Sequence, residues 1–482
     1  GDYDVDGVTA TALFTAVFKA CGLAVDAILP HRMEEGYGFQ PVHAERAAEA
    51  GCRVVVTADC GTTATAAVAA ARDRSLDVIV TDHHIPGPEL PAGTVQVNPK
   101  QDDCPYPFKE LSGAGLAFKL ALAVADRCGK PVELAKLLRI ACLGTIADLV
   151  PLVGENRTIA ALGLEALSAT QSVGLRALIR QSGLKKAAVT AVDVGFRLGP
   201  RINAAGRMDS AESALELLLC RDAVRAESLA RRLDAWNRQR QEAEQRAVEE
   251  ARAMIEALPE LPRVLVAWSP DWHRGVVGIA AGRLARDLHR PALLLAVDGD
   301  SAVGSGRSIH GFHLHEFLLP WRPRMERFGG HAQAVGLTVP VDALEDLRGE
   351  WQEAAATLDE GLFERRHRYE LEVAPGEAGE RLLAELAALE PHGQDNQRPL
   401  LRVGPLRLAA PPRHFGRGHL WAPALGDDGG EVRLLGWSWQ SRVSDLAGRF
   451  EVLAYLERDD YRGGTTLRLV DARPAGSAAT TP

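Results

Sequence analysis

Apolar and polar residues follow a changing pattern along the chain, and in the first 150 residues short apolar runs precede Ala-rich stretches. The runs at 53–57 and 76–81 and the sequence TVQVNP at 94–99 predict three buried strands. TATAAVAAARD at 63–73 predicts a helix between the first two. Because strands that alternate with helices are typical of a doubly wound parallel sheet, we expect an α/β fold here.

The pattern changes after residue 210. The chain from 211 to 258 holds no Gly or Pro, and its charged composition from Ser228 onward predicts a long, mostly exposed helix that connects two domains. A second α/β unit follows, with predicted strands at 263–269 and 291–299 and a predicted helix at 275–288. From about Tyr369 to Val470, short β-type runs broken by Gly and Pro predict a small barrel.

Composition narrows the class of protein. The 482 residues are 46% hydrophobic and 25% charged, as expected for a soluble chain of about three domains, and no apolar run approaches the roughly 20 residues of a membrane span. The net charge of −9 gives no basic footprint of nucleic-acid binding, although a basic groove can lie on an acidic protein. Seven cysteines without a C-x-x-C pair argue against a zinc site and a secreted disulfide framework, and predict a reducing cytoplasm.

The chain opens with GDYDVDGVTA, where Asp2, Asp4 and Asp6 alternate before Gly7. So many carboxylates in one short segment indicate a cation site or, more simply, a solvated acidic turn. A calcium loop of the EF-hand type needs a bidentate Glu at its twelfth position, and that position, counted from Asp2, is Leu13. The motif therefore does not fit an EF-hand.

Further acidic and imidazole side chains follow the predicted strands. Asp59 comes after the first strand, and Asp82, His83 and His84 come after the second. Asp148 lies in LGTIADLVPL, after a helical stretch. Ligands of parallel sheets bind at the carboxyl ends of the strands, so we expect these residues to meet there.

Carboxylates mixed with imidazole suit Mn²⁺ or a similar ion better than Ca²⁺. A carboxylate shared by two ions would hold them about 3.5–4 Å apart, the spacing of two-metal phosphoester hydrolysis. Each motif alone is a weak signal, because an Asp that follows a strand is most often a helix N-cap. Their joint placement at strand ends favours a metal centre.

Taken together, the motifs resemble a known family. DYDVDG, TADCGTT, VTDHH and GTIADLVPL are similar to the four successive motifs of the DHH phosphoesterases. GPRINAAGRM, RGVVGIAAGRL, GSGRSI and FGGHAQAVGLTV resemble further motifs of one branch, the RecJ 5′→3′ single-stranded-DNA exonucleases. The resemblance continues through LEPHGQDNQRPLL and the late β segment, which is similar to the RecJ OB domain, so it covers nearly the whole chain.

The resemblance implies roles for the matching residues. Asp4 would bind a first metal ion and Asp6 a second, and Asp59 would bridge the two. His83 and Asp148 would complete the second site.

The remaining residues of these motifs would have other roles. His84 would lie close to the scissile phosphate, Asp82 would orient its neighbours, and Asp2 is interpreted as a turn-stabilising residue. Related enzymes often carry a further metal-binding His four residues before the position of Asp4. That position lies before Gly1, where we also expect an apolar β-type run in the natural protein.

The second domain is expected to hold the DNA. GSGRS offers Ser305 and Arg307 as an anion cradle, and GGH offers His331 in the same manner. Arg32 in PHRMEEGYGF is a candidate from the first domain. Arg201 and Arg207 in GPRINAAGR could reach phosphates, with a structural ion pair as an equal alternative. The OB-type barrel would add a groove for single strands.

The resulting prediction is a metal-dependent exonuclease that removes 5′-mononucleotides from single-stranded DNA in bacterial repair and recombination. The expected cofactor is a pair of Mn²⁺ ions, with Mg²⁺ as an alternative. Expected partners are single-stranded DNA, the single-strand-binding protein and a helicase, for a cytoplasmic monomer without membrane association. The predicted parts are a DHH catalytic domain (1–195), a motif-bearing linker with the long helix (196–258), a DHH-associated substrate-binding domain (259–348), an OB-fold domain (349–475) and a tail (476–482).

Two alternatives stay open. Another DHH enzyme could cleave very short oligonucleotides or cyclic dinucleotides, and the long helix and late β domain argue against it. The chain could also be an inactive DNA-binding scaffold, but such proteins lose ligands, whereas every readable ligand position here is filled.

Overall fold

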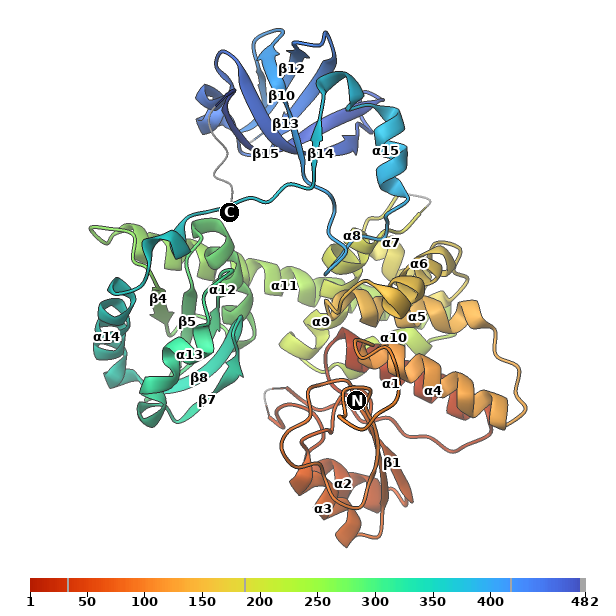
Figure 1. Ribbon diagram of the computed structural model, residues 1–482. Helices are drawn as coiled ribbons and strands as arrows, with labels where there is room; N and C mark the ends of the chain where they lie inside the picture. Colours follow the sequence, from red (N-terminus) through yellow and green to blue (C-terminus); the bar gives the residue numbers. More distant parts are fainter. Residues whose placement is uncertain (33, 186–187, 417, 477–482) are drawn as a thin grey trace. The chain divides into compact units, whose positions relative to one another are not determined.

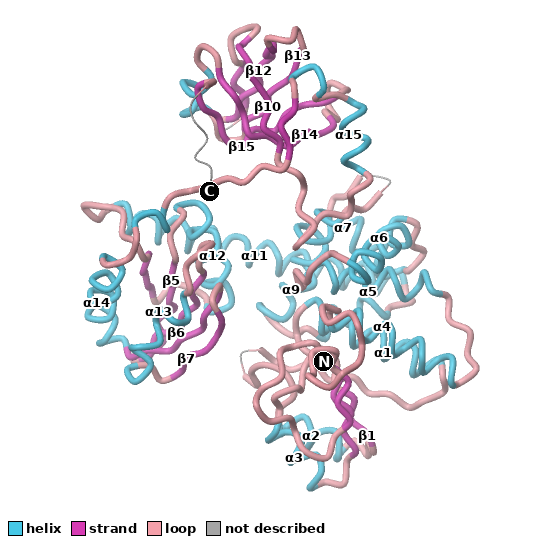
Figure 2. The backbone as a smooth tube through the Cα atoms, in the orientation of Figure 1, coloured by secondary structure: helices cyan, strands magenta, loops and turns pink. Residues whose placement is uncertain are grey.

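The computed structural model describes residues 1–32, 34–185, 188–416 and 418–476, and the chain divides into two compact units (Figure 1). The first comprises residues 1–150 and 158–365, and the second comprises residues 151–157 with the chain from 366 onward. The strands form three separate sheets (Figure 2), two in the first unit and one in the second. Residues 477–482 of the predicted tail lie outside the described residues.

The first sheet is parallel, in the order β1 (Val54–Val56), β2 (Asp77–Thr81), β3 (Val95–Val97). Helices α2 (Pro41–Glu49) and α3 (Thr65–Asp73) share one apolar core with β2. The three strands and α3 lie where the sequence predicts them, so the predicted parallel α/β fold is confirmed. The carboxyl ends of β1 and β2 lead directly into the motifs that hold Asp59 and Asp82–His84.

Helices make up most of the chain between the first two sheets. The opening helix α1 (Val5–Ala20) packs against α4 and α5. The helices that follow the first sheet are α4 (Gly113–Arg127), α5 (Leu134–Ala147), α6 (Gly154–Ser168), α7 (Val173–Gln181), α8 (Ala191–Asp193), the π-helical turn η1 (Val194–Leu198), α9 (Gly199–Met208) and α10 (Glu212–Leu219).

The long connecting helix is confirmed as α11 (Ala223–Glu256). Its N-terminal part packs against α7 and α9, and its C-terminal part packs against α12 and β4 of the second sheet. Asp222 caps it by accepting a hydrogen bond from the Arg225 amide. Within one unit, α11 therefore joins the helices around the first sheet to the second sheet.

The second sheet is mixed, in the order β4-β5-β6-β8-β7, and only β4 and β5 run parallel. α12 connects β4 to β5, and the predicted strands and helix of this region are confirmed. Helices α11 and α12 cover one face of the sheet, and α14 covers the other. The elements are β4 (Leu265–Ser269), α12 (Arg274–Leu288), β5 (Ala292–Asp298), β6 (Ser301–Arg307), α13 (Leu314–Leu318), η2 (Leu319–Arg324), β7 (Arg327–His331), β8 (Ala334–Pro340), η3 (Val341–Ala343), α14 (Leu344–Ala356) and η4 (Glu360–Phe363).

The boundary predicted at residue 348 falls inside α14. Leu347 before it and Trp351 and Ala355 after it belong to the same buried core as the second sheet. Gly349 lies inside this helix and directly after the predicted boundary, so the glycine here does not mark the end of a domain.

The second unit contains a closed β-barrel, as predicted. β10 pairs with both β12 and β14, which closes the ring β10-β12-β13-β15-β14, while β9 and β11 add to its edges. Closure removes the open edges of the five barrel strands. The elements are β9 (Leu371–Val373), η5 (Pro375–Glu377), α15 (Glu380–Ala387), β10 (Leu401–Leu408), β11 (Arg413–Phe415), β12 (His419–Gly426), β13 (Glu431–Gly436), η6 (Gln440–Leu446), β14 (Phe450–Arg458) and β15 (Thr465–Pro474).

A cavity of about 660 Å³ lies between α1, residues 23–30 and β1, and its walls include Phe14, Phe18 and Val54. Gly1 donates a hydrogen bond to the Ile28 carbonyl at 2.8 Å. The expected β-type run before Gly1 stays a prediction. Within the described ranges, no helix is both long and apolar enough to cross a bilayer.

Trp351 is a fully buried side chain of the second sheet's core. Trp351→Ala should lower the unfolding free energy of this part by about 3–5 kcal/mol, because it removes apolar contact and leaves a cavity. Denaturant unfolding followed by circular dichroism measures the change. Leu319→Ala, at a side chain 49% exposed in the same domain, is the control and should change little. A similar small effect of both variants would contradict the described core.

Candidate active site

The opening motif forms the start of α1. Asp4 is the N-cap, and its Oδ1 accepts the Gly7 amide at 3.0 Å. Asp6 lies in the first turn, and the amides at the start of α4 hold its carboxylate: Gly113 donates to Oδ2 at 2.6 Å and Ala114 to Oδ1 at 2.9 Å. A helix N-terminus favours a negative charge, so α4 fixes Asp6 in a buried position.

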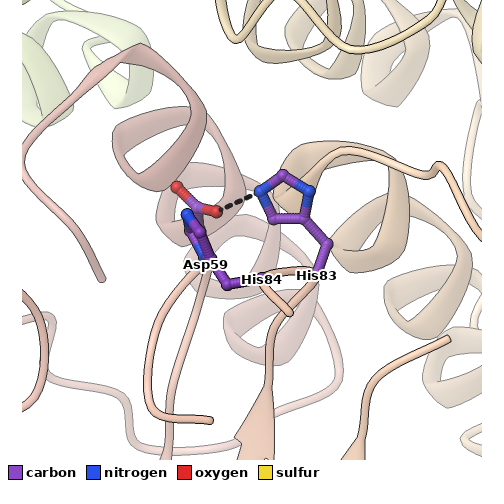
Figure 3. Close-up of side chains that lie close together, drawn as sticks. All are labelled: Asp59, His83 and His84. Carbon is purple, nitrogen blue, oxygen red and sulfur yellow. Dashed lines mark ion pairs between the residues drawn. The ribbon is translucent and has the colours of Figure 1, made fainter. Parts of the chain in front are cut away.

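His83 is surrounded by carboxylates from three separate elements. Its Nε2 lies 3.0 Å from Asp59 Oδ1, 3.5 Å from Asp148 Oδ2 and 3.7 Å from Asp6 Oδ2. Figure 3 shows Asp59 facing the His83 ring, with His84 beside them. Asp59 follows β1, His83 follows β2, and Asp148 is the C-cap of α5. The structure therefore brings together residues that are up to 142 positions apart (148 − 6).

The backbone around these carboxylates is tightly constrained. Asp59 has a φ of 63°, a left-handed conformation that costs a non-Gly residue energy and often marks a functional site. A Cβ on Gly113 would lie 2.5 Å from Asp59 Cβ, and one on Gly144 would lie 2.4 Å from Asp6 Oδ1. Both glycines are needed, because any side chain there would displace a carboxylate.

Burial and mutual repulsion disfavour the charged forms of these groups. Burial, and then the charge of Asp4, raise the pKa of Asp6 to about 7. Burial, and then Asp6, raise the pKa of Asp148 to about 9, and burial and the same neighbours hold the pKa of Asp59 well above its usual range. Burial lowers the pKa of His83 to about 3, so the imidazole is neutral. The cluster thus has many hydrogen-bond acceptors and too little positive charge to balance its carboxylates.

A second network lies beside the first. Asp82 accepts hydrogen bonds from the amides of Thr62 (2.9 Å), His83 (2.7 Å) and His84 (3.1 Å). Its Oδ1 also lies 2.7 Å from His84 Nδ1. Burial lowers the pKa of His84, but the hydrogen bond and charge of Asp82 outweigh it and raise the pKa. Asn98 Nδ2 donates a hydrogen bond to the His84 carbonyl oxygen at 2.8 Å. Asp82 thus binds the backbone of residues 83 and 84 and the His84 ring, and the orienting role that the family resemblance implies stays a prediction.

Several buried polar atoms of the cluster have no hydrogen-bond partner among the described residues. They include Asp59 Oδ1, His83 Nε2 and Asp2 Oδ1. Ligand atoms within 4.8 Å of one another form three groups: Asp59, His83 and His84; Asp6, His83 and Asp148; and Asp2, Asp4 and Asp59. A neutral imidazole with carboxylates fits a divalent ion such as Mn²⁺.

Asp2 lies closer to the other carboxylates than the prediction of a turn-stabilising residue implies. It is 2% exposed and lies in the same group as Asp4 and Asp59. Burial, and then Asp4, raise its pKa to about 7. Asp2 therefore belongs to the cluster, and the signal for this was the alternation of all three aspartates rather than any single position.

Positive charge gathers in a second cluster, which we call the arginine cluster: Arg32, Arg207, Ser305 and Arg307. Arg307 Nη1 lies 2.8 Å from Ser305 Oγ, and the Arg32 guanidinium lies 4.9 Å from the Tyr3 ring centroid. Burial, and then Arg32, lower the pKa of Arg207 to about 10 and also lower the pKa of Arg307. Half-buried cations that repel one another form a suitable anion site.

The other two candidates lie apart from this cluster. Arg201 pairs with Asp234 of α11, with Nη2 2.8 Å from Oδ1, as the alternative of a structural ion pair predicts. His331 is exposed on β7. Ala334 on β8 is the paired residue of both His331 on β7 and Arg307 on β6, so His331 and Arg307 lie on the same face of the sheet. They are separated by two strand spacings of about 4.8 Å each.

Comparison with known families supports this description. The chain matches the DHH family, N-terminal domain, over residues 1–145, the DHHA1 domain over residues 261–357 and the RecJ OB domain over residues 369–470. The first two ranges contain the parallel sheet and the second sheet, and the third covers the barrel as far as Val470 in its last strand, β15.

Curated relatives agree. The chain is 36% identical to the single-stranded-DNA-specific exonuclease RecJ of Escherichia coli over 98% of this chain and 85% of that protein. It is 41% identical to RecJ of Bacillus subtilis over 84% of this chain, and it spans about half of that relative's length, 51%.

A solved structure agrees as well. RecJ of Thermus thermophilus in complex with Mn²⁺ superimposes with a TM-score of 0.83 at 32% identity, covering 98% of this chain and 68% of the other. The same protein in complex with Mg²⁺ gives a TM-score of 0.77 at 30% identity, covering 98% and 66%. The fold, the order of domains and these identities have one explanation: the chain belongs to the RecJ family of DHH proteins.

Proposed function

We propose that this protein is a divalent-metal-dependent exonuclease that removes 5′-mononucleotides from the 5′ end of single-stranded DNA. The observation that carries the proposal is the buried cluster of Asp6, Asp59 and Asp148 around the unpartnered Nε2 of His83. The names of the relatives, single-stranded-DNA-specific exonuclease RecJ, support the substrate.

The ligand groups support two ion positions. Asp6, His83 and Asp148 would hold one ion, and Asp4 would hold the other with Asp2 beside it. Asp59 belongs to the group with Asp2 and Asp4, and its Oδ1 lies 3.0 Å from His83 Nε2, which favours a role as a bridge between the two ions. The relative's complexes with Mn²⁺ and Mg²⁺ support either ion, and we favour Mn²⁺ because imidazole is a ligand.

Divalent ions bound here would activate water and neutralise charge on a phosphodiester. The chain's own residues would do the rest. Asp82 raises the pKa of His84, which favours the imidazolium form that can donate a hydrogen bond to a phosphate oxygen. Arg307 and Ser305, with Arg32 and Arg207, would bind the terminal 5′-phosphate. His331 would contact the strand farther along the same sheet face, whereas Arg201 would act through its ion pair with Asp234.

The barrel supports a long single strand rather than a very short oligonucleotide or cyclic dinucleotide. Trp421 lies on β12 with the guanidinium of Arg462 4.6 Å and that of Arg413 5.8 Å from its ring centroid. Exposed Phe415 and Trp437 form a second aromatic group with half-buried His419. Aromatic and basic side chains of this kind bind strands by stacking. A cytoplasmic setting, monomeric state, helicase and single-strand-binding partner stay predictions.

The central test is digestion of end-labelled single strands with Mn²⁺, with Mg²⁺ and with chelator. Wild-type protein should release mononucleotides from the 5′ end with either ion and none with chelator. Asp59→Asn should lose more than about 100-fold in rate, because a carboxylate shared by two ligand groups has no substitute. In chelator the same variant should be more stable by about 1–2 kcal/mol, because an amide is neutral without the cost of protonation that the raised pKa of Asp59 imposes on folding.

Asp102→Asn, at an exposed surface position, is the matched control and should change neither property. Near-normal turnover by Asp59→Asn would show that the centre lies elsewhere. Stable binding of strands by wild-type protein without cleavage, at saturating Mn²⁺, would favour the scaffold alternative.

Stability should depend on pH in a direction set by the raised carboxyl pKa values. Above about pH 6.5 the unfolded imidazoles are neutral, while Asp6 and Asp148 stay partly protonated in the folded protein up to about 7 and 9. The folded state then binds more protons, so the unfolding free energy should fall from pH 6.5 to 9 in chelator. Mn²⁺ should remove this fall, because it takes the place of the protons.

Thermal unfolding across this pH range measures the effect. Asp148→Asn should flatten the fall in chelator, mainly between pH 7 and 9. Equal slopes for wild type and variant would contradict the assignment to this cluster.

Arg307 should discriminate between strand ends. Charge-assisted hydrogen bonds from Arg to phosphate are worth about 1.5–3 kcal/mol, so Arg307→Ala should lower kcat/KM on 5′-phosphorylated strands about tenfold or more. Strands with a 5′-hydroxyl should lose much less, because they lack the recognised group.

Arg286→Ala is the matched control, since Arg286 is exposed in the last turn of α12 in the same domain. Its kcat/KM should be unchanged on both substrates. Equal losses on both strands with Arg307→Ala would assign Arg307 to general backbone binding.

A further inference from the structure

One helix, α9 (Gly199–Met208), contacts both the opening motif and the arginine cluster. On the side of the opening motif, Asn203 Oδ1 accepts the Val5 amide at 3.0 Å. Val5 lies between Asp4 and Asp6, so the Asn203 side chain holds the backbone between two of the proposed metal ligands.

Gly206 brings the helix backbone itself against the same motif. A Cβ at this position would lie 2.9 Å from the Tyr3 carbonyl oxygen and 3.4 Å from Tyr3 Cβ. The contact is backbone against backbone, so a side chain could be accommodated only if the opening motif and α9 moved apart.

Arg207, the residue after Gly206, contacts the domain that carries Ser305 and Arg307. Arg207 Nη1 donates to the Gly275 carbonyl at 3.0 Å, and a Cβ on Gly275 would lie 3.1 Å from the Arg207 carbonyl oxygen. α12 begins at this contact. One turn later, a Cβ on Gly278 would lie 2.8 Å from Ser305 Oγ and 3.1 Å from Arg307 Nη2.

These contacts form a continuous path from the carboxylates to the arginines, and its central part is residues 203–207 of one helix. An α-helix is stiff over such a short length, because each backbone N–H is hydrogen-bonded to the carbonyl four residues earlier. At a rise of about 1.5 Å per residue, the segment is also short. The separation between the two clusters is therefore set by α9 rather than by a loop. That separation matters, because misplacing a reacting group by about 1 Å can cost about 100-fold in rate.

We propose that α9 is a positioning element that fixes the distance between the metal-binding motif and the 5′-phosphate site, so that each cut falls after one nucleotide. Asn203 is its positioning residue, and Gly206 is the close contact that sets its distance. The inference rests on the proposed exonuclease function and adds what determines the length of the product.

Two variants disrupt the contacts between α9 and the opening motif in different ways. Asn203→Ala removes the acceptor of the Val5 amide, and Gly206→Ala forces α9 away from Tyr3. Asn203→Asp keeps an oxygen of the same reach and is the rescue variant. Gly195→Ala is the matched control, because a Cβ on Gly195, just before α9, meets nothing within 4 Å.

The first measurement does not depend on turnover. Mn²⁺ is paramagnetic, so it relaxes the ³¹P signal of a 5′-terminal phosphate steeply with distance. A 5′-phosphorylated strand whose first linkage is a non-hydrolysable phosphonate is bound to each Mn²⁺-loaded protein. The relaxation rate should change in Asn203→Ala and Gly206→Ala and should match wild type in the other two variants. Mn²⁺ affinity, titrated separately, should stay within about threefold in all four.

The second measurement is cleavage of 5′-phosphorylated strands at saturating Mn²⁺. The two disrupting variants should lose about tenfold or more in kcat, with KM within about twofold, because the phosphate site itself is intact. Dinucleotides should appear beside mononucleotides. Asn203→Asp should recover the mononucleotide product and most of kcat.

Wild-type ³¹P relaxation and mononucleotides alone from both disrupting variants would overturn the proposal. So would a loss of rate that extra Mn²⁺ restores completely, since the defect would then lie in metal affinity. Failure of the proposed function looks different: wild-type protein would release no nucleotides, while the ³¹P measurement would still decide whether α9 sets the separation.

Discussion

Repulsion between buried carboxylates is the constraint on which the rest of the site depends. Asp6, Asp59 and Asp148 all approach His83 Nε2 within 3.7 Å, and burial makes their charges costly. Coulomb energies at such separations are several times larger in a protein than in water. The amides of α4 offset part of this cost for Asp6, and Lys100 offsets part for Asp148. The remaining charge is what a divalent cation would neutralise.

The fold keeps these groups together by covalent and steric means rather than by attraction. Asp59 and His83 follow adjacent parallel strands, so their positions depend on the pairing of β1 with β2. Because Gly113 and Gly144 have no Cβ, α4 and α5 can lie closer to the carboxylates than helices with side chains at these positions could. A site built in this way exists only after the fold has formed, because no local segment contains enough of it.

The alternation of apolar runs with helical stretches was enough to predict the parallel sheet, the long helix α11 and the barrel, since each depends on local pattern. Asp59 and His83 could be predicted as neighbours because they follow adjacent strand ends, whereas Asp6 and Asp148 belong to helices and join them only through tertiary packing. Other features depend on tertiary contacts and could not be. Nothing near Arg201 in sequence shows that Asp234, 33 residues later, pairs with it. The contact of Asn203 with Val5, 198 residues apart, is likewise not visible in the sequence.

The two clusters carry opposite charge, and this asymmetry bears on direction. Arg207 and Arg307 both have lowered pKa values because burial and Arg32 disfavour their charged forms, so an anion between them relieves a cost already present. A terminal phosphate can carry two negative charges, whereas each internal phosphodiester carries one, so the terminus gains more from this site. The carboxylate cluster instead requires positive charge, and it repels a strand until a cation is bound. Under the proposed function, a strand that satisfies both clusters at once would place its 5′ end at the arginines and its first linkage at the carboxylates, which would restrict cleavage to one end.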